Sequence, residues 1–344
     1  MKKQIALLLT LVLMVGLLAA CGGSDKEKNN NGNDKGADGG SDKKQRIALV
    51  LPEKIGVNPF FELMDQGLKK AGEEFGVEVK TTEASDPAAF EQNLRSAVAD
   101  NYDLIITATF QAEDALNKVA AENPNRPFAI VDTKVDLPNV RSVAFREHEA
   151  AFLLGAVAGL VTKTNKVGAV VAMDVPIMTR YTKGFEQGLK QTNPNAEFII
   201  NYVNSFNDAA KGKELALDQH AKGADFIAGI AAIGDFGVWE AAKEQGFYSS
   251  GQDVDRTVED PEHVIVSQLK GADTVTYETV KSFVNNTFEF GEVDYGLKED
   301  GVGLTYVTRD SVTPLSPAIG QENIDKVKAL AQDVISGKIE VMSK

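Results

Sequence analysis

The sequence predicts an α/β protein of two lobes, each a doubly wound parallel sheet with helices on both faces. Short apolar runs rich in β-branched residues alternate with segments of helical period after residue 44. This alternation is typical of parallel sheets covered by helices. A chain of 344 residues is long enough for two domains, and no long linker interrupts the pattern. We therefore expect two lobes of similar size with a ligand site between them.

Residues 166–217 show the pattern most clearly. Residues 167–172 and 198–203 predict two buried strands, and each is followed by a segment of helical period. Asp174 and Pro176 favour the start of the first of these helices, since aspartate caps helices and proline is tolerated in the first turn. Ligands bind at the carboxyl ends of strands in such sheets, so the segment after each strand is a candidate part of a site.

The other elements are expected in the following order. Strands are predicted at residues 45–51, 77–81, 104–108, 128–131, 140–145, 225–229, near 248, 264–269 and 303–307. Helices are predicted at residues 61–75, 88–99, 112–122, 148–163, 236–245, 272–288 and 324–335. The helix at 148–163 is strongly apolar, but its centre of about 12 residues is too short to cross a membrane. We expect it to be buried, with Gly155 and Gly159 allowing close packing on a sheet.

The first 20 residues have the layout of a secretory signal. Lys2 and Lys3 precede an apolar run over residues 5–20, which is shorter than the roughly 20 residues of a comfortable membrane span. The run ends at Cys21, and this junction resembles a bacterial lipobox. That resemblance implies cleavage before Cys21 and a lipid on its thiol; an ordinary signal with a chance cysteine is the alternative.

Residues 22–44 are expected to be a disordered linker. Apart from glycine, Ala37 is the only apolar residue in this stretch. Such a composition cannot bury enough surface to offset the entropy of ordering. The folded body is therefore expected to begin near residue 45.

Composition excludes several classes of function. The net charge of −14 argues against nucleic acid as a partner, because phosphate binding needs a basic face. Cys21 is the only cysteine, so disulfides and thiolate metal sites are excluded from the folded part. The three histidines are widely separated and lack the spacing of metal ligands. We expect neither a metal nor a cofactor.

Two segments carry a resemblance to a known family. GAVVAMDVPIMTRYTKGFEQGLK, followed by NYVNSFNDAAKGKELAL, resembles the basic membrane protein family, also called purine nucleoside receptor A-like proteins. These are lipid-anchored, nucleoside-binding components of ABC importers. The resemblance implies a monomeric protein on the extracytoplasmic face of the cell membrane, with a nucleoside ligand and ABC permease subunits as partners.

The resemblance also implies a type I periplasmic-binding-protein fold, in which the chain crosses three times between the lobes. Crossings are expected near Phe145, Leu269 and Val307. The first lobe would then contain residues 45–145 and 270–306, and the second residues 146–269 and 307–344.

Three charged residues are candidate ligand-binding residues, two of them for a ribose. Asp253 lies in a Gly-X-Asp-X-Asp segment that resembles the family motif whose first aspartate holds ribose hydroxyls. A carboxylate can accept two hydroxyl hydrogen bonds at once, although a solvated turn is the alternative role. Lys270 resembles the family lysine that reaches the ribose, but could also be a surface residue after a strand. Asp132 ends a strand where ligands bind, and a cap or turn role remains open.

Four further candidates are aromatic or glycine residues. Gly234 and Phe236 lie in a turn before a helix, where backbone N–H groups could meet an oxygen-rich ligand. Phe110 and Phe60 could stack on a base, or could belong to the core.

The chain departs from the family at one position. The family has a phenylalanine–asparagine pair before its first helix, and that asparagine contacts the base. Here the corresponding residues are Phe60 and Phe61, preceded by Asn58 and Pro59, and Asn58 has a different offset. This segment also resembles sugar-binding members of the wider fold.

The sequence contains no motif that assembles a catalytic site. It lacks a phosphate-binding Gly-Lys loop, a dinucleotide glycine fingerprint and a Gly-X-Ser-X-Gly elbow. We expect a binding protein rather than an enzyme. A sugar-binding or sensory receptor of the same fold, and a nucleoside hydrolase, remain the alternatives.

Overall fold

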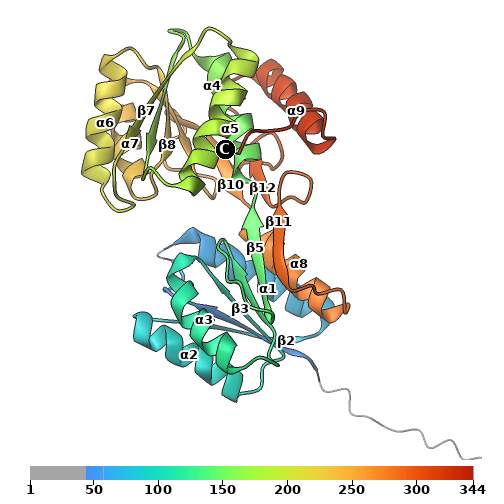
Figure 1. Cartoon of the computed structure of the whole chain (residues 1–344). Coiled ribbons are helices and arrows are strands. Elements are labelled where there is room, and N and C mark those ends of the chain that lie inside the picture. Colours follow the sequence, from blue (N-terminus) through green and yellow to red (C-terminus); the bar gives the residue numbers. More distant parts are fainter. Residues whose placement is uncertain (1–43, 57, 344) are drawn as a thin grey trace, which may run out of the picture. The chain divides into compact units, whose positions relative to one another are not determined.

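The computed structural model describes residues 44–56 and 58–343 (Figure 1). The expected signal peptide, Cys21 and nearly all of the expected linker lie outside the described residues. Residues 44–344 belong to one compact unit. In the part that the structure describes, no helix has the length and apolar character needed to cross a membrane.

The first sheet has six strands in the order β2-β1-β3-β4-β5-β11, and every neighbouring pair is parallel. Its strands are β1 (Arg46–Leu51), β2 (Glu78–Glu83), β3 (Leu104–Ala108), β4 (Phe128–Val131), β5 (Val140–Phe145) and β11 (Gly291–Tyr295). The helices are α1 (Pro59–Phe75) and α8 (Ala272–Val284) on one face, and α2 (Pro87–Ala99) and α3 (Glu113–Glu122), preceded by the short η1 (Phe110–Ala112), on the other. Side chains of β1 alternate between the two faces, with Ile47 and Leu49 packing toward α1 and Ala48 and Val50 toward α2 and α3.

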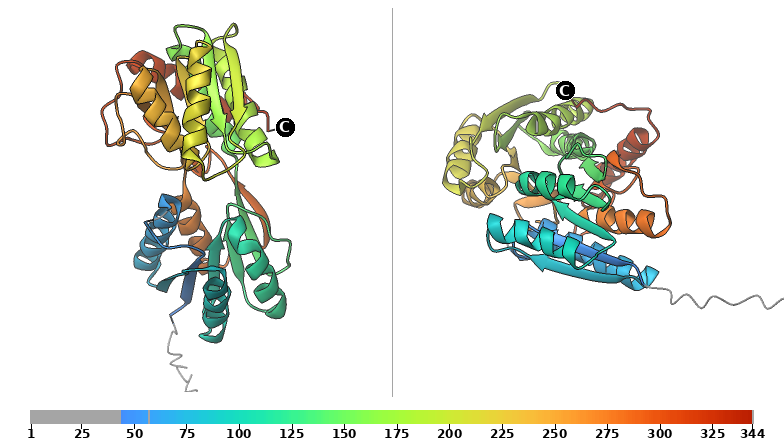
Figure 2. Two further views of the ribbon diagram at one scale, coloured as in Figure 1. Left: turned by 90° about the vertical axis from the view of Figure 1, so that its left-hand side faces the viewer. Right: turned by 60° about the horizontal axis from the view of Figure 1, so that its bottom comes forward.

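The second sheet has the order β7-β6-β8-β9-β10-β12, and only β12 is antiparallel to its neighbour. Its strands are β6 (Lys166–Val171), β7 (Glu197–Tyr202), β8 (Phe226–Ile230), β9 (Tyr248–Gly251), β10 (Val264–Lys270) and β12 (Val302–Leu304). The helices are α4 (Glu147–Val161), α5 (Pro176–Thr192), α6 (Ala209–Ala221), α7 (Gly234–Gln245) and α9 (Gln321–Ile335). Helices α4 and α5 cover one face of this sheet and α6 and α7 the other, as the two views of Figure 2 show. The expected fold class is therefore confirmed.

The close packing expected of Gly155 and Gly159 is present, but its partner is a helix. A Cβ atom at Gly155 would overlap the carbonyl of Phe185 in α5, and one at Gly159 would overlap the Thr192 side chain. Gly188 in α5 meets α4 in the same way. The glycines thus bring α4 and α5 into backbone contact, rather than bringing α4 onto the sheet.

The third crossing between the lobes differs from the prediction. The chain leaves the first sheet after β5 and returns after β10, near the expected Phe145 and Leu269. It crosses for the last time between β11 and β12, before the expected Val307. Strand β12, which the predicted boundary at residue 306 placed in the first lobe, pairs with β10 of the second sheet.

Two element boundaries also differ. Strand β11 was not predicted, and α8 ends at Val284, so the four residues at the end of the predicted helix lead into this strand instead. Helix α1 begins at Pro59 with Asn58 as its cap, two residues before the predicted start at residue 61. The Asn58 side chain accepts a hydrogen bond from the Phe60 N–H at 3.0 Å, as an N-cap residue does.

Candidate functional site: the strand ends of both sheets

The carboxyl ends of strands in both sheets carry residues in left-handed backbone conformations. Four of them are Thr109 after β3 (φ 67°), Asp132 after β4 (φ 69°), Ala232 after β8 (φ 55°) and Asp253 after β9 (φ 66°). Left-handed backbone is unusual for residues other than glycine, most of all for a β-branched threonine. Such strain persists where the surrounding structure holds it, and it clusters at ligand sites. Two of the four are candidate site residues from the sequence, Asp132 and Asp253.

An ion pair joins the two sheets at these strand ends. Lys270, the last residue of β10, places its Nζ 2.8 Å from Oδ1 of Asp132, which follows β4. The amine also lies 5.5 Å from the centre of the Phe145 ring and 6.0 Å from that of Phe60. The structure therefore brings together three of the predicted site residues, Phe60, Asp132 and Lys270, from segments far apart in the sequence.

The environment of Lys270 keeps it charged although it is buried. Burial alone acts against the charge, but the carboxylates around it outweigh this effect, Asp132 most strongly and Asp253 after it. The pKa of Lys270 is consequently raised well above its usual value. An ammonium has three donors, and Asp132 accepts one of them. No other acceptor of the described residues bonds to this amine, so two of its donors are available.

Asp253 lies beside this pair with its carboxylate unengaged. Its backbone carbonyl accepts a hydrogen bond from the Lys270 N–H at 2.9 Å, which fixes the two residues next to each other. Within the described residues, no donor lies in hydrogen-bond range of its carboxylate oxygens. Burial raises the pKa of Asp253, while Lys270 opposes that shift. A partly buried carboxylate without donors is suited to accept hydrogen bonds from ligand hydroxyls.

The predicted aromatic residues differ in exposure. The Phe110 side chain is 67% exposed at the start of η1, and Phe236 is 44% exposed in the first turn of α7. Phe60 is buried and packs edge-on against Phe61 and Phe145. Phe110 and Phe236 are thus accessible to a ligand, although the Arg256 guanidinium lies 5.9 Å from the centre of the Phe236 ring, whereas Phe60 is enclosed.

The role predicted for the backbone at Gly234 is not supported. The N–H of Gly234 donates to the Ala231 carbonyl at 2.9 Å, and the N–H of Phe236 donates to Ile233 at 3.3 Å. Asp235 between them donates to Ala232 at 3.1 Å. These groups are therefore already used within the turn. Gly234 remains at a strand end of the second sheet, but its donors do not point to a ligand.

Residues near the family's asparagine position have structural roles. Phe61 is fully buried and belongs to the core under the first sheet. The carbonyl oxygen of the Asn58 side chain is used as the cap of α1. Phe61 therefore offers no amide contact to a base, and the side-chain oxygen of Asn58 is already engaged.

Glu147 and Arg180 were missed by the sequence analysis. Glu147 begins α4 and is buried, and the Arg180 guanidinium lies 3.1 Å from its carboxylate. Burial raises the pKa of Glu147 to about 7, although Lys270 and Arg180 oppose the shift. The signal was a glutamate at the start of a helix that is otherwise almost entirely apolar. Glu147 lies next to the first crossing and interacts electrostatically with Lys270, so it belongs to the surroundings of the candidate site.

No cluster of three or more metal-ligating side chains is present in residues 44–56 and 58–343. The site consists instead of one amine, two carboxylates and aromatic rings. Such groups bind a polar organic molecule through hydrogen bonds and stacking. Two α/β lobes, each built on a mostly parallel sheet and joined by three crossings, have the architecture of solute receptors of the periplasmic-binding-protein type.

Comparisons with known proteins identify the family. Residues 44–344 match the family described as ABC transporter substrate-binding protein, PnrA-like. The chain therefore belongs to this family of extracytoplasmic substrate-binding proteins of ABC transporters, as the resemblance in the sequence implied.

Relatives cover the whole chain. It is 30% identical to a CD4+ T-cell-stimulating antigen of Listeria innocua, over 100% of this chain and 99% of the relative. It is also 30% identical to the ABC transporter nucleoside-binding protein BmpA of Lactococcus lactis, with full coverage of both. A solved ABC transporter solute-binding protein from Aeropyrum pernix has 27% identity and a TM-score of 0.70, over 87% of this chain and 94% of that one.

Proposed function

We propose that this protein is a lipid-anchored receptor that captures a purine nucleoside between its two lobes and delivers it to an ABC permease. The observation that supports this proposal best is the group formed by Lys270, Asp132 and Asp253. Lys270 has two unused donors and Asp253 has an unused carboxylate, on adjacent strand ends. A vicinal diol such as that of ribose can donate to the carboxylate and accept from the amine.

The relative named as a nucleoside-binding protein supports the ligand class. In the proposed complex Asp132 orients Lys270, Asp253 and Lys270 hold the ribose, and Phe110 stacks on the base. Base–aromatic stacking contributes roughly 1–3 kcal/mol. Because Phe61 replaces the family's asparagine and is buried, we expect the base to be held mainly by stacking.

Thermal unfolding with nucleosides tests the proposal. A ligand that binds only the folded state stabilises it by about 2.7 kcal/mol at a hundredfold excess over its dissociation constant. Guanosine, inosine or adenosine should therefore raise the melting temperature, and free ribose should do so weakly. Asp253→Ala removes hydrogen bonds worth roughly 1.5–3 kcal/mol each, so affinity should fall at least tenfold.

Asp136→Ala is the matched control, because Asp136 is exposed on a loop and has no ion-pair partner in the described part of the chain. It should bind nucleosides like the native protein. Equal binding by the native protein and the Asp253 variant would mean that the site is misplaced. A response to sugars but to no nucleoside would favour a sugar receptor, and release of free base from inosine would favour a hydrolase.

The lipid anchor is tested separately. Cys21→Ala should leave the protein unprocessed or release it from membranes in cell fractionation. A variant that is still processed and equally membrane-bound would exclude the thiol as the attachment point.

A further inference from the structure

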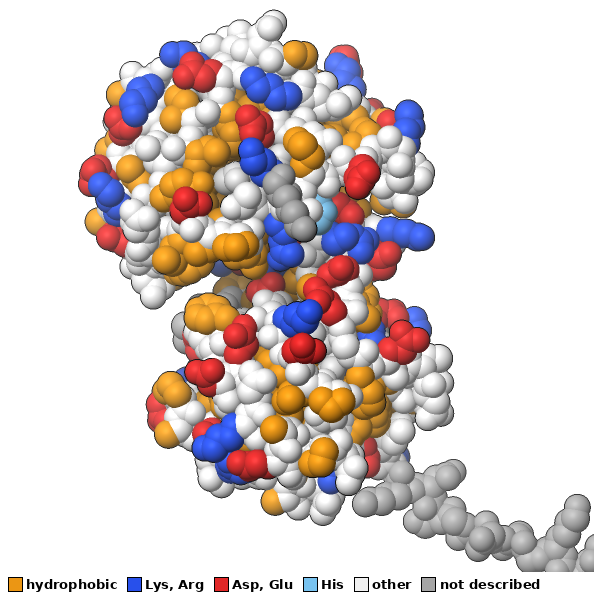
Figure 3. Space-filling model, in the orientation of Figure 1, with side chains coloured by type: hydrophobic (Ala, Val, Ile, Leu, Met, Phe, Trp, Pro, Cys, Tyr) orange, Lys and Arg blue, Asp and Glu red, His pale blue; other side chains and the backbone are white. Residues whose placement is uncertain are grey.

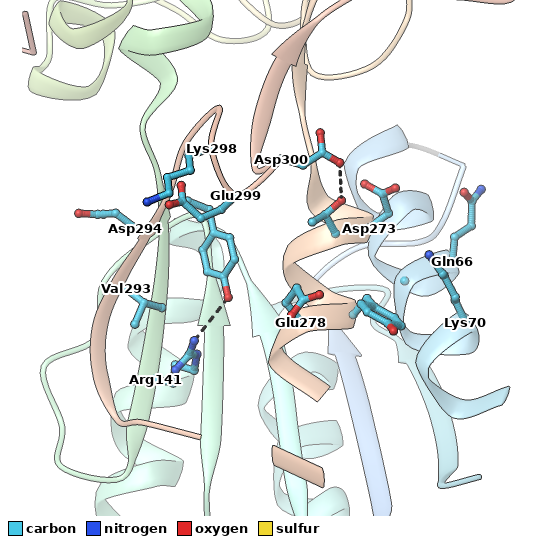
Figure 4. Close-up of a pocket in the computed structure, with 14 residues that line it drawn as sticks. Gln66, Lys70, Arg141, Asp273, Glu278, Val293, Asp294, Lys298, Glu299 and Asp300 are labelled. Carbon is cyan, nitrogen blue, oxygen red and sulfur yellow. Dashed lines mark hydrogen bonds between the residues drawn. The ribbon is translucent and has the colours of Figure 1, made fainter. Parts of the chain in front are cut away.

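A large cavity lies on the first lobe, away from the candidate nucleoside site. It has a volume of about 1040 Å³ and is formed by α1, α8, β5, β11 and the segment that follows β11 (Figure 4). None of the candidate ligand residues discussed above lines it. Its walls are rich in charged side chains, so the distribution of charge decides what it can hold.

Five acidic side chains line this cavity, and four of them already have cationic partners that are not lining residues. The pairs are Asp273 and Asp300 with Arg309, Glu299 with Arg146, and Glu278 with Lys281. Only Asp294 lacks such a partner among the described residues. Three cations outside the lining thus pair with four of its carboxylates and reduce the negative charge of the walls.

The three basic residues of the lining are in the opposite situation. No carboxylate in the described part of the chain lies within 4.0 Å of the charged nitrogens of Lys70, Arg141 or Lys298. Arg141 on β5 is only 6% exposed. Its Nη1 donates to the Glu289 carbonyl at 2.9 Å and its Nη2 lies 3.5 Å from the Tyr295 hydroxyl, while its buried Nε has no partner.

A buried guanidinium without a counterion is unfavourable, because burial removes water from the charge and nothing negative replaces it. Here the unsatisfied Nε belongs to a side chain that lines an open cavity, with Lys298 on the same side and Lys70 on α1 (Figure 4). A guanidinium fork matches the two oxygens of a carboxylate or phosphate group. We propose that this cavity binds a small multivalent oxyanion through Arg141, with Lys70 and Lys298 adding attraction at the rim.

The proposal is independent of nucleoside binding and is tested with inorganic phosphate and citrate. Each should raise the melting temperature of the native protein saturably, compared with sodium chloride at the same ionic strength. The anion that binds with the higher affinity shows whether the site prefers a tetrahedral phosphate or planar carboxylates. Arg141→Met should weaken binding of that anion at least tenfold, while nucleoside binding stays unchanged.

Arg126→Met is the matched control. Arg126 is a partly buried arginine of the same lobe that donates to the Tyr102 carbonyl, has no carboxylate partner in the described part, and does not line the cavity. It should bind the anion normally. If Arg141→Met does not fold, the Lys70→Met/Lys298→Met pair of exposed substitutions should weaken binding several-fold instead. The proposal would be overturned if neither anion stabilised the native protein saturably. It would also be overturned if Arg126→Met lowered the anion affinity as much as Arg141→Met does.

Discussion

Lys270 and Arg141 are the two buried cations of the described residues, and their surroundings differ in one respect. Lys270 is 7% exposed and meets a carboxylate at 2.8 Å, whereas Arg141 is 6% exposed and meets none within 4.0 Å. Elsewhere acidic and basic side chains are interspersed, as on the face shown in Figure 3. The comparison indicates that the chain satisfies one buried cation internally, and leaves the other for a partner from outside.

The largest expected difference between the two cations is in stability. Removing one member of a buried ion pair typically costs roughly 3–5 kcal/mol, because the other charge is left uncompensated. Lys270→Met should therefore lower the free energy of unfolding by about 3 kcal/mol. Arg141→Met removes a charge that has no partner, so its effect should stay within about 1 kcal/mol.

Urea unfolding of both variants in a buffer without phosphate, citrate or nucleoside measures this difference. A large loss of stability in Arg141→Met would show that the hydrogen bonds of Arg141 to Glu289 and Tyr295 stabilise the fold strongly. The contrast between the two cations would then be wrong.

The fold was largely predictable from the sequence because apolar strands and helices alternate in it with clear periods. Strand β11 was missed because it is an edge strand whose sequence is polar and mostly exposed. Strand β12 was assigned to the wrong lobe, since pairing with β10 is a tertiary event that no local pattern records.

The arrangement of the candidate site residues was predictable to a different extent. The residues Asp132, Asp253 and Lys270 could be named individually from the resemblance and from their positions after strands. That Asp132 and Lys270 form an ion pair could not, because 138 positions separate them in sequence. Arg141 gave no signal at all: it lies within an apolar strand, and its missing counterion is a property of the folded surroundings.

A second substitution should restore part of the stability lost in Lys270→Met. Asp132→Asn removes the charge left behind, and asparagine tolerates the left-handed backbone at this position. The double variant should therefore be more stable than Lys270→Met by roughly 2 kcal/mol, within the range of couplings between contacting residues. A double-mutant cycle in urea measures this coupling, and strict additivity would mean that the ion pair contributes nothing.

The charge around Lys270 should also respond to pH through Glu147. Its pKa is raised from 4.5 to about 7, mainly by burial. The folded protein therefore keeps this proton after the unfolded chain has lost it, and stability falls as pH rises from about 4.5 to about 7. The glutamine in Glu147→Gln cannot ionise. The stability of this variant relative to that of the native protein should therefore increase by roughly 2 kcal/mol as pH rises from 5 to 8.

Melting temperatures of the two proteins across this range provide the measurement. Because every other titrating group is shared, their contributions cancel in the difference. A difference that is constant with pH would mean that Arg180 and Lys270 hold Glu147 ionised throughout. The pH dependence of Arg141→Met should parallel that of the native protein, since no carboxylate of the described residues is paired with Arg141.

The smallest effect is expected at the rim of the cavity that contains Arg141. Lys298 is exposed there, and charges separated by more than about 8 Å are largely screened at physiological ionic strength. Lys298→Met should change the free energy of unfolding by less than about 0.5 kcal/mol. It should weaken phosphate or citrate binding about two- to threefold at low salt, and less at high salt, because its attraction acts through solvent.

Lys328→Met is the matched control. Lys328 is an exposed residue of α9 that also has no ion-pair partner in the described residues. Its substitution should change neither the free energy of unfolding nor the affinity for the anion. If Lys298→Met lowered the anion affinity as much as Arg141→Met does, and independently of salt, the anion would lie against Lys298. Arg141 would then no longer be the centre of the site.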